Sequence, residues 1–140
     1  MLQVRLKQLI MRKNMKTILL VDDEPAILTV LELLLNKFGY IVIPKSNAES
    51  ALFLIREGVN IDLIITDYRM PGMNGIEFIR VLRRILPSVP VLMLTGDITV
   101  EIEPSLGVFE RINKPVPGKE LDRIVRAALD QSDANKFIMA

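Results

Sequence analysis

Four apolar runs in this chain each end in a polar side chain suited to metal or phosphate chemistry. In chain order, the runs and the residues that follow them are 17–21 with Asp22 and Asp23, 63–66 with Asp67, 91–94 with Thr95, and 108–113 with Lys114. Ligands bind outside the carboxyl ends of the strands in an open parallel sheet. The pattern therefore predicts a site built from three carboxylates, a hydroxyl and an ammonium group.

Strand-like and helix-like segments alternate along the chain, which is typical of an α/β fold with a parallel sheet. We predict a flavodoxin-like (βα)5 doubly wound sheet with strand order 2-1-3-4-5. The predicted strands are 17–21, 41–43, 63–66, 90–94 and 108–112. Pro25 predicts the start of the first helix and Gly39 its end. A capping box of Ser46 and Glu49 predicts the start of the second helix, which should end near Gly58. Asn74 and Glu77 predict the start of the third helix, and Pro117-Gly118 precede the last one.

The fourth helix should be short or irregular, because Gly96–Gly107 is a brief segment that contains Pro104. We divide the chain into an N-terminal extension or linker (1–15), a main domain (16–131) and a C-terminal tail (132–140) that we expect to fray. The extension is basic and partly apolar, so a surface or partner helix is an open alternative to a simple linker.

Composition removes several classes of function. The 140 residues fit one domain, include no cysteine or histidine, and carry a net charge of +1. Disulfides, thiol chemistry, the usual zinc ligand and a histidine base are thereby excluded. The charge gives no general case for direct nucleic-acid binding. No apolar run is long enough to span a bilayer.

Strand order 2-1-3-4-5 brings Asp22, Asp23 and Asp67 to neighbouring strand ends. Like charges at short range raise one another's pKa, and a divalent cation relieves this. Mg²⁺ prefers one or two carboxylates together with water and phosphate oxygens. A carboxylate can also attack phosphorus, with Lys114 and Thr95 stabilising the transferred group.

The combination of Asp22-Asp23, Asp67 with MPGMNG at 70–75, Thr95 and Lys114-Pro115 resembles the receiver domain of two-component response regulators (CheY-like). The resemblance covers about residues 16–130. It implies that Asp67 is the phosphoacceptor, Thr95 the switch hydroxyl and Lys114 the phosphate partner. It also implies Mg²⁺ held by Asp22, Asp23, Asp67 and the backbone carbonyl of Arg69, and a cis Lys114–Pro115 bond.

The resemblance further implies a signalling role in the cytoplasm. The donor would be a histidine kinase or a histidine phosphotransfer protein, with an unknown downstream protein partner. Self-phosphorylation with Mg²⁺ and slow autodephosphorylation would be the only reactions. A homodimer could form through the face of the fourth helix, fifth strand and fifth helix. The chain departs from the family at Arg111, where receivers usually carry Tyr or Phe. Phe109, two residues earlier, is expected to share a strand face with Arg111.

Other interpretations of these residues remain open. Asp22, Asp23 and Glu24 could form an acidic first helical turn, with Glu24 as helix-start charge only. A phosphatase of the haloacid-dehalogenase type would need an acid two residues after the nucleophile, where Arg69 follows Asp67. A binding module that no longer accepts phosphate is a third alternative, motivated by Arg111 and the short fourth helix.

Overall fold

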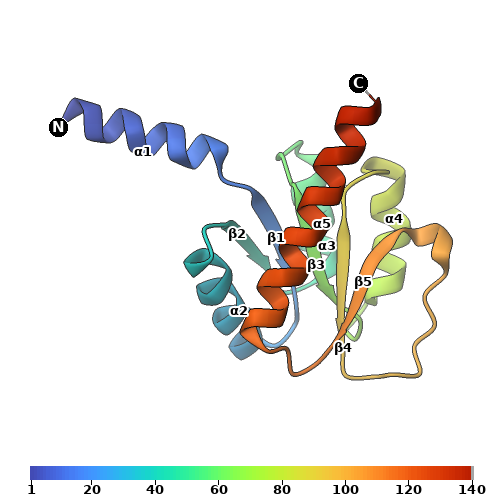
Figure 1. Cartoon of the computed structure of the whole chain (residues 1–140). Coiled ribbons are helices and arrows are strands. Elements are labelled where there is room, and N and C mark those ends of the chain that lie inside the picture. The colour runs from blue at the N-terminus through green and yellow to red at the C-terminus, as the bar shows by residue number, and fades with distance from the viewer. Residues whose placement is uncertain (140) are drawn as a thin grey trace.

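A five-stranded parallel sheet lies between two layers of helices (Figure 1). The computed structural model describes residues 1–139. The strands are β1 (Thr17–Val21), β2 (Ile41–Lys45), β3 (Leu63–Asp67), β4 (Val91–Thr95) and β5 (Val108–Asn113), in the order β2-β1-β3-β4-β5. The helices are α1 (Leu2–Asn14), α2 (Pro25–Lys37), α3 (Ala48–Arg56), α4 (Gly75–Ile85), α5 (Gly118–Met139) and the 3₁₀ turn η1 (Pro104–Leu106). The predicted fold and strand order are confirmed.

The central strands are buried on both faces, as their continuous apolar sequences require. Successive side chains of β1 alternate between two cores: Ile18 and Leu20 pack toward α2 and α5, whereas Leu19 and Val21 pack toward α3 and α4. All five residues of β3 and of β4 are buried. The sheet therefore holds the ends of β1, β3 and β4 in fixed positions, and these ends carry the candidate site.

Local signals placed most helix ends correctly. The Asn74 side chain accepts a hydrogen bond from the Glu77 N–H, and Glu77 accepts one from the Asn74 N–H, so the predicted capping box is present. Gly39 follows α2 with φ +97°. The predicted Ser46 cap is wrong by one residue: Asn47 caps α3, because its side-chain oxygen accepts from the Ser50 N–H at 2.7 Å.

The connection between β4 and β5 lacks a regular helix. In residues 96–107, hereafter the β4–β5 segment, the only helical turn is η1, which ends at Gly107 in the left-handed region (φ +67°). The prediction that the helix between the fourth and fifth strands is short or irregular is confirmed. We expected a homodimer to form through this helix, the fifth strand and the fifth helix. Without a regular helix here, such a face would consist of β5 and α5.

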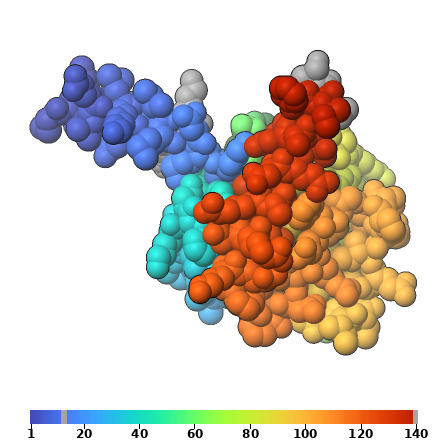
Figure 2. Space-filling view, in the orientation of Figure 1, coloured from blue at the N-terminus to red at the C-terminus, as the bar shows by residue number. Residues whose placement is uncertain are grey.

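Helices lie at both ends of the described residues. The expected fraying after Ser132 is wrong, since α5 continues to Met139. Lys16, just before β1, forms an ion pair with Asp133, with 3.2 Å between Nζ and Oδ1. This contact connects the last part of α5 to the start of β1. At the other end, α1 projects from the body (Figure 2), and several of its apolar residues are exposed. Within the described residues, no helix combines the length and apolar character that crossing a membrane would require.

Candidate functional site

Asp67 ends β3 at the centre of the sheet. It is 5 % exposed, and its strand lies between β1 and β4. The loop after it turns back tightly, with the Gly75 N–H donating to the Tyr68 carbonyl at 2.7 Å. A Cβ atom at Gly75 would lie 2.3 Å from the Asp67 carbonyl oxygen, so only glycine allows this approach. The start of α4 therefore rests against the backbone of the candidate acceptor.

Lys114 joins the ends of three strands. Its Nζ lies 2.9 Å from Asp22 Oδ2 and 3.2 Å from Asp67 Oδ2, and the Lys114–Pro115 bond is cis as expected. Burial opposes the charge of Lys114, but the contacts with both carboxylates outweigh it and raise its pKa. Burial, followed by the nearby Asp22 charge, raises the pKa of Asp67 despite Lys114. One ammonium thus only partly compensates the negative charge of the site.

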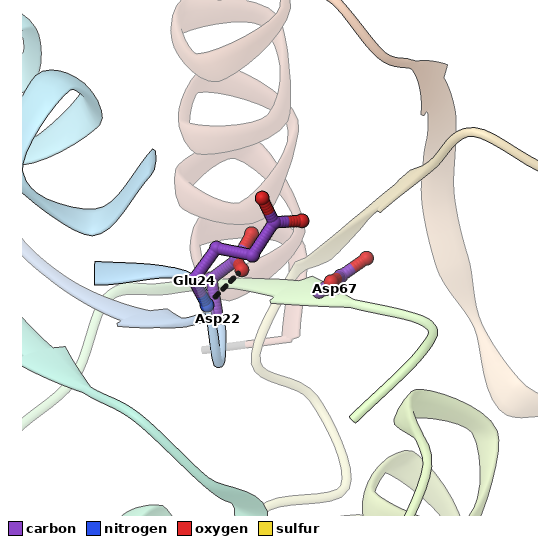
Figure 3. A group of neighbouring side chains, drawn as sticks. All are labelled: Asp22, Glu24 and Asp67. Carbon is purple, nitrogen blue, oxygen red and sulfur yellow. Dashed lines mark hydrogen bonds between the residues drawn. The ribbon is translucent and has the colours of Figure 1, made fainter. Parts of the chain in front are cut away.

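The Glu24 carboxylate lies close to those of Asp22 and Asp67. Oxygen atoms of Asp22, Glu24 and Asp67 lie within 4.8 Å of one another (Figure 3). Asp22 is fully buried, and both of its oxygens are engaged, one by the Glu24 N–H at 2.9 Å and the other by Lys114. Glu24 was expected to act as helix-start charge only. It does stand at the N-terminus of α2 without capping it, but its carboxylate lies in the acidic cluster, where the sequence had placed only Asp22, Asp23 and Asp67.

Asp23 faces the cleft above these groups. The cleft has a volume of about 680 Å³. Its lining consists of Asp23, Glu24, Asp67, Arg69, Thr95, Gly96, Asp97, Ile98 and Lys114. Several hard oxygen ligands around an accessible space are the donor set that Mg²⁺ prefers. The residues present therefore fit a magnesium ion: the carboxylates of Asp22, Glu24 and Asp67 converge, and Asp23, which lies outside this group of three, lines the same cleft.

The Thr95 hydroxyl is engaged by the residue two positions later. Its Oγ1 accepts from the Asp97 N–H at 3.0 Å and donates to the Asp97 carbonyl at 3.4 Å. The Asp97 carboxylate in turn accepts from Thr99 and forms an ion pair with Arg69, with 2.8 Å between Nη2 and Oδ2. Hydrogen bonds from Thr99 and Arg69 lower the pKa of Asp97 to about 2.

All the side chains predicted for the site gather at this sheet edge. Sequence reasoning missed the Asp97 side chain and the Arg69 guanidinium, which was considered only for its backbone carbonyl. Spacing could have indicated Asp97, because it follows Thr95 by two residues in a loop at the same edge. The pairing of Arg69 with Asp97 had no sequence signal, since the two residues lie in different loops.

The departure at Arg111 has a clear structural form. Arg111 is exposed, and its guanidinium donates to the Val100 carbonyl in the β4–β5 segment. Phe109 packs against the core beneath α2 and α5. The expectation that it shares a strand face with Arg111 is therefore wrong, because the pairing of β4 with β5 shifts register between Val108 and Glu110. The strand position that is usually aromatic in the resembled family therefore anchors the β4–β5 segment by a polar contact.

The fold and the cleft define a doubly wound α/β domain with an acidic site at the carboxyl ends of its parallel strands. The chain matches the response regulator receiver domain family over residues 18–126. It therefore belongs to this family, whose members are the receiver domains of two-component systems.

Two curated relatives of the chain are transcriptional regulatory proteins. The chain is 37% identical over 122 residues to the transcriptional regulatory protein AfsQ1 of Streptomyces coelicolor, covering 85% of this chain and 53% of the relative. For GlrR of Escherichia coli the identity is 39% over 119 residues, with coverage of 82% and 26%. The chain thus spans about half, or a quarter, of the length of these curated relatives.

Solved structures support the same family. A receiver domain protein from Clostridium thermocellum superposes with a TM-score of 0.80 and 31% identity, covering 86% of this chain and 98% of that one. A CheY-like receiver domain protein from Methanospirillum hungatei gives a TM-score of 0.81 at 29% identity, covering 87% and 99%.

Proposed function

We propose that the chain is a phosphorylation-switched receiver that accepts a phosphoryl group on Asp67 from a phosphohistidine donor in a Mg²⁺-dependent reaction. The observation that carries the proposal is Lys114, whose Nζ contacts both Asp22 and Asp67 at the floor of an open cleft. An Asp67 oxygen bonds to phosphorus as the bond from phosphorus to the donor nitrogen breaks. The electron pair of that bond leaves with the donor imidazole.

Positive charge must balance the oxygens of the transferred group. Mg²⁺ would be held by Asp23, Asp67 and the Arg69 carbonyl, with Asp22 acting from beneath, and it would supply charge neutralisation and orientation. Lys114 can turn from Asp67 toward the phosphoryl oxygens while it keeps its contact with Asp22. Thr95, which is 1% exposed at the end of β4, can donate its hydroxyl proton to a phosphoryl oxygen once its contact with Asp97 is released.

A protein donor also needs a surface beside the cleft. An apolar cavity of about 450 Å³ adjoins the site, and its lining consists of Ala26, Ile27, Val30, Leu31, Leu94, Lys114, Pro115 and Val116. Because Lys114 lines both this cavity and the cleft, a donor seated here would reach Asp67. We assign this surface to the histidine kinase or phosphotransfer protein. Substituting Val30, which is 62% exposed, with Asp should slow transfer from such a protein more than transfer from acetyl phosphate.

The proposal includes a signalling role in the cytoplasm without turnover of small phosphate esters and without direct nucleic-acid binding. Slow autodephosphorylation would restore Asp67. This part rests on membership of the receiver family. A haloacid-dehalogenase-like activity is disfavoured because Arg69, not an acid, stands two residues after Asp67.

Intact-mass analysis after incubation with acetyl phosphate and Mg²⁺ tests the proposal. One phosphoryl adduct is expected on the parent chain, and none on Asp67→Ala or on the parent with the metal chelated. Asp133→Ala is the matched control, because this aspartate forms an exposed ion pair far along α5. An adduct on Asp67→Ala would refute the acceptor assignment. No adduct on a parent chain that binds Mg²⁺ would favour a phosphorylation-independent binding module.

A further inference from the structure

The cleft contains a cation whose present partner is a surface carboxylate. Of the residues lining the cleft, Arg69 and Lys114 are the positively charged ones. Lys114 is already shared between two buried carboxylates. Arg69 contacts only Asp97 among the ion pairs of the described residues, and its side chain is 75% exposed. Arg69 is therefore the cation most easily transferred to a new anion in the cleft.

Asp97, the partner of Arg69, also forms hydrogen bonds with the Thr95 hydroxyl through its backbone. Asp97 uses its carboxylate for Arg69 and Thr99, and its backbone N–H and carbonyl for Thr95. The hydroxyl cannot turn toward Asp67 and keep both of these backbone contacts. A change at the Asp97 carboxylate will therefore be felt at Thr95.

An exposed arginine–carboxylate pair is weak, with a net contribution of about 0–1 kcal/mol. A phosphoryl group carries more charge than a carboxylate and offers several oxygens for the forked donors of a guanidinium. The two candidate partners of Arg69 lie on the same cleft, since Asp67 and Asp97 both line it. Competition between them should favour the phosphoryl group.

We propose that Arg69 exchanges the Asp97 carboxylate for the phosphoryl group when Asp67 is modified, and that this exchange frees Thr95 and loosens the β4–β5 segment. Arg69 is a phosphoryl-binding side chain in this mechanism, and Asp97 is a positioning residue that acts through Thr95. The inference rests on the proposed function. It goes beyond that function by assigning a role to the Arg69 side chain and by naming the contact that couples the site to the segment.

The neighbouring contacts define where the loosening should stop. Beyond Asp97, the segment is held by Arg111 on Val100, by the Arg80–Glu103 pair at 2.6 Å, and by Arg83 on the Leu106 carbonyl at 2.7 Å. None of these three arginines lines the cleft. Hydrogen exchange should therefore rise near residues 96–99 on phosphorylation and change least near Leu106.

A double-mutant cycle with Asp97→Asn and Arg69→Gln tests the exchange, with labelling by acetyl phosphate followed by intact mass. Without its competitor Arg69 is free from the start, so Asp97→Asn should speed labelling about two- to fivefold, the range that an exposed ion pair allows. In the Arg69→Gln background the same substitution should change the rate less than about 1.5-fold, because coupled residues are not additive. Equal acceleration in both backgrounds would mean a simple charge effect and would overturn the proposal.

Glu103→Gln is the matched control, since it breaks another exposed arginine–carboxylate pair of the same segment away from the cleft. It should leave the labelling rate unchanged. An acceleration equal to that of Asp97→Asn would mean that loosening the segment is sufficient, and the exchange would be refuted.

Amide hydrogen exchange gives a second readout independent of rate. Peptides covering residues 96–99 should exchange faster in the parent once the adduct has formed, and faster in Asp97→Asn even without it. A parent chain that forms the adduct with no change in these peptides would refute the exchange and leave the acceptor assignment intact. A parent chain that forms no adduct would overturn both.

Discussion

The two connections on either side of β4 solve the same problem in different ways. Between β3 and β4 the chain forms a capped helix, α4, that buries Phe78, Ile79 and Leu82 against the sheet. Between β4 and β5 it forms one 3₁₀ turn and adds one buried side chain, Leu106, to the same core, against which Ile102 packs partly buried. The first connection is held by apolar packing and the second largely by arginine side chains.

Both connections nevertheless deliver their neighbouring strand end to the site. Thr95 lies opposite Asn113 in the β4–β5 ladder, and Asp67 lies opposite Leu94 in the β3–β4 ladder. Strand register fixes these positions, so the geometry of the site does not depend on a regular helix in the second connection.

The largest expected difference between the two connections is in the core. Leu82→Ala in α4 should lower the free energy of unfolding by about 4 kcal/mol and Leu106→Ala by about 2 kcal/mol, within the usual range for buried leucines. Leu82 is surrounded by rigid helix and sheet, whereas the irregular segment around Leu106 can partly close the cavity. Urea denaturation measures both values. Equal losses would show that the segment is as rigid as α4.

The next effect concerns the arginine contacts. Arg83 donates to the carbonyls of Leu106 at 2.7 Å and Gly107 at 3.0 Å. Arg83→Met keeps much of the side-chain volume but leaves these acceptors unpaired, so it should cost about 1–2 kcal/mol. Arg84→Met is the control, because Arg84 is exposed on the same helix. A loss shared equally by both variants would assign the effect to helix propensity and not to the segment.

This comparison also explains what the sequence could predict. The strands and α4 follow from apolar runs and from the Asn74–Glu77 signal, which act locally, and Asp22, Asp67, Thr95 and Lys114 follow from the strand ends. The arginine contacts of the β4–β5 segment could not be predicted. They join residues far apart in sequence, as Arg69–Asp97 and Arg83–Leu106 do. The Ser46 cap failed because Asn47, one residue later, offers a better placed acceptor.

A smaller effect is expected at the start of α4. Asn74→Ala removes the side-chain acceptor of the capping box and should destabilise the protein by about 1 kcal/mol. Because the start of α4 rests against Asp67, the same variant should also broaden the amide resonances of residues 67–69 in NMR spectra. Glu77→Gln is the control, since glutamine can replace glutamate in the capping box. A loss from Glu77→Gln as large as that from Asn74→Ala would contradict the capping explanation.

The smallest effect separates two carboxylates across one cleft by their response to pH. Thr99 and Arg69 lower the pKa of Asp97 to about 2, whereas burial and Asp22 raise the pKa of Asp67 above 3.8. The unfolded chain binds more protons at residue 97 than the folded one between pH 4 and 2, so stability from Asp97 is complete above pH 4 and is lost as the pH falls through 2. Asp67 has the opposite effect on stability: its ionised form disfavours folding, and this penalty develops as the pH rises through its raised pKa.

Asp67→Asn should therefore raise the melting temperature at neutral pH and lose that advantage in acid. Asp97→Asn should remove a small loss of stability that the parent shows between pH 4 and 2. Carboxyl ¹³C titration by NMR gives both pKa values directly. An Asp97 that titrates near 3.8 would show that its contacts with Thr99 and Arg69 do not persist in solution, and the link from Arg69 to Thr95 would then lack its middle member.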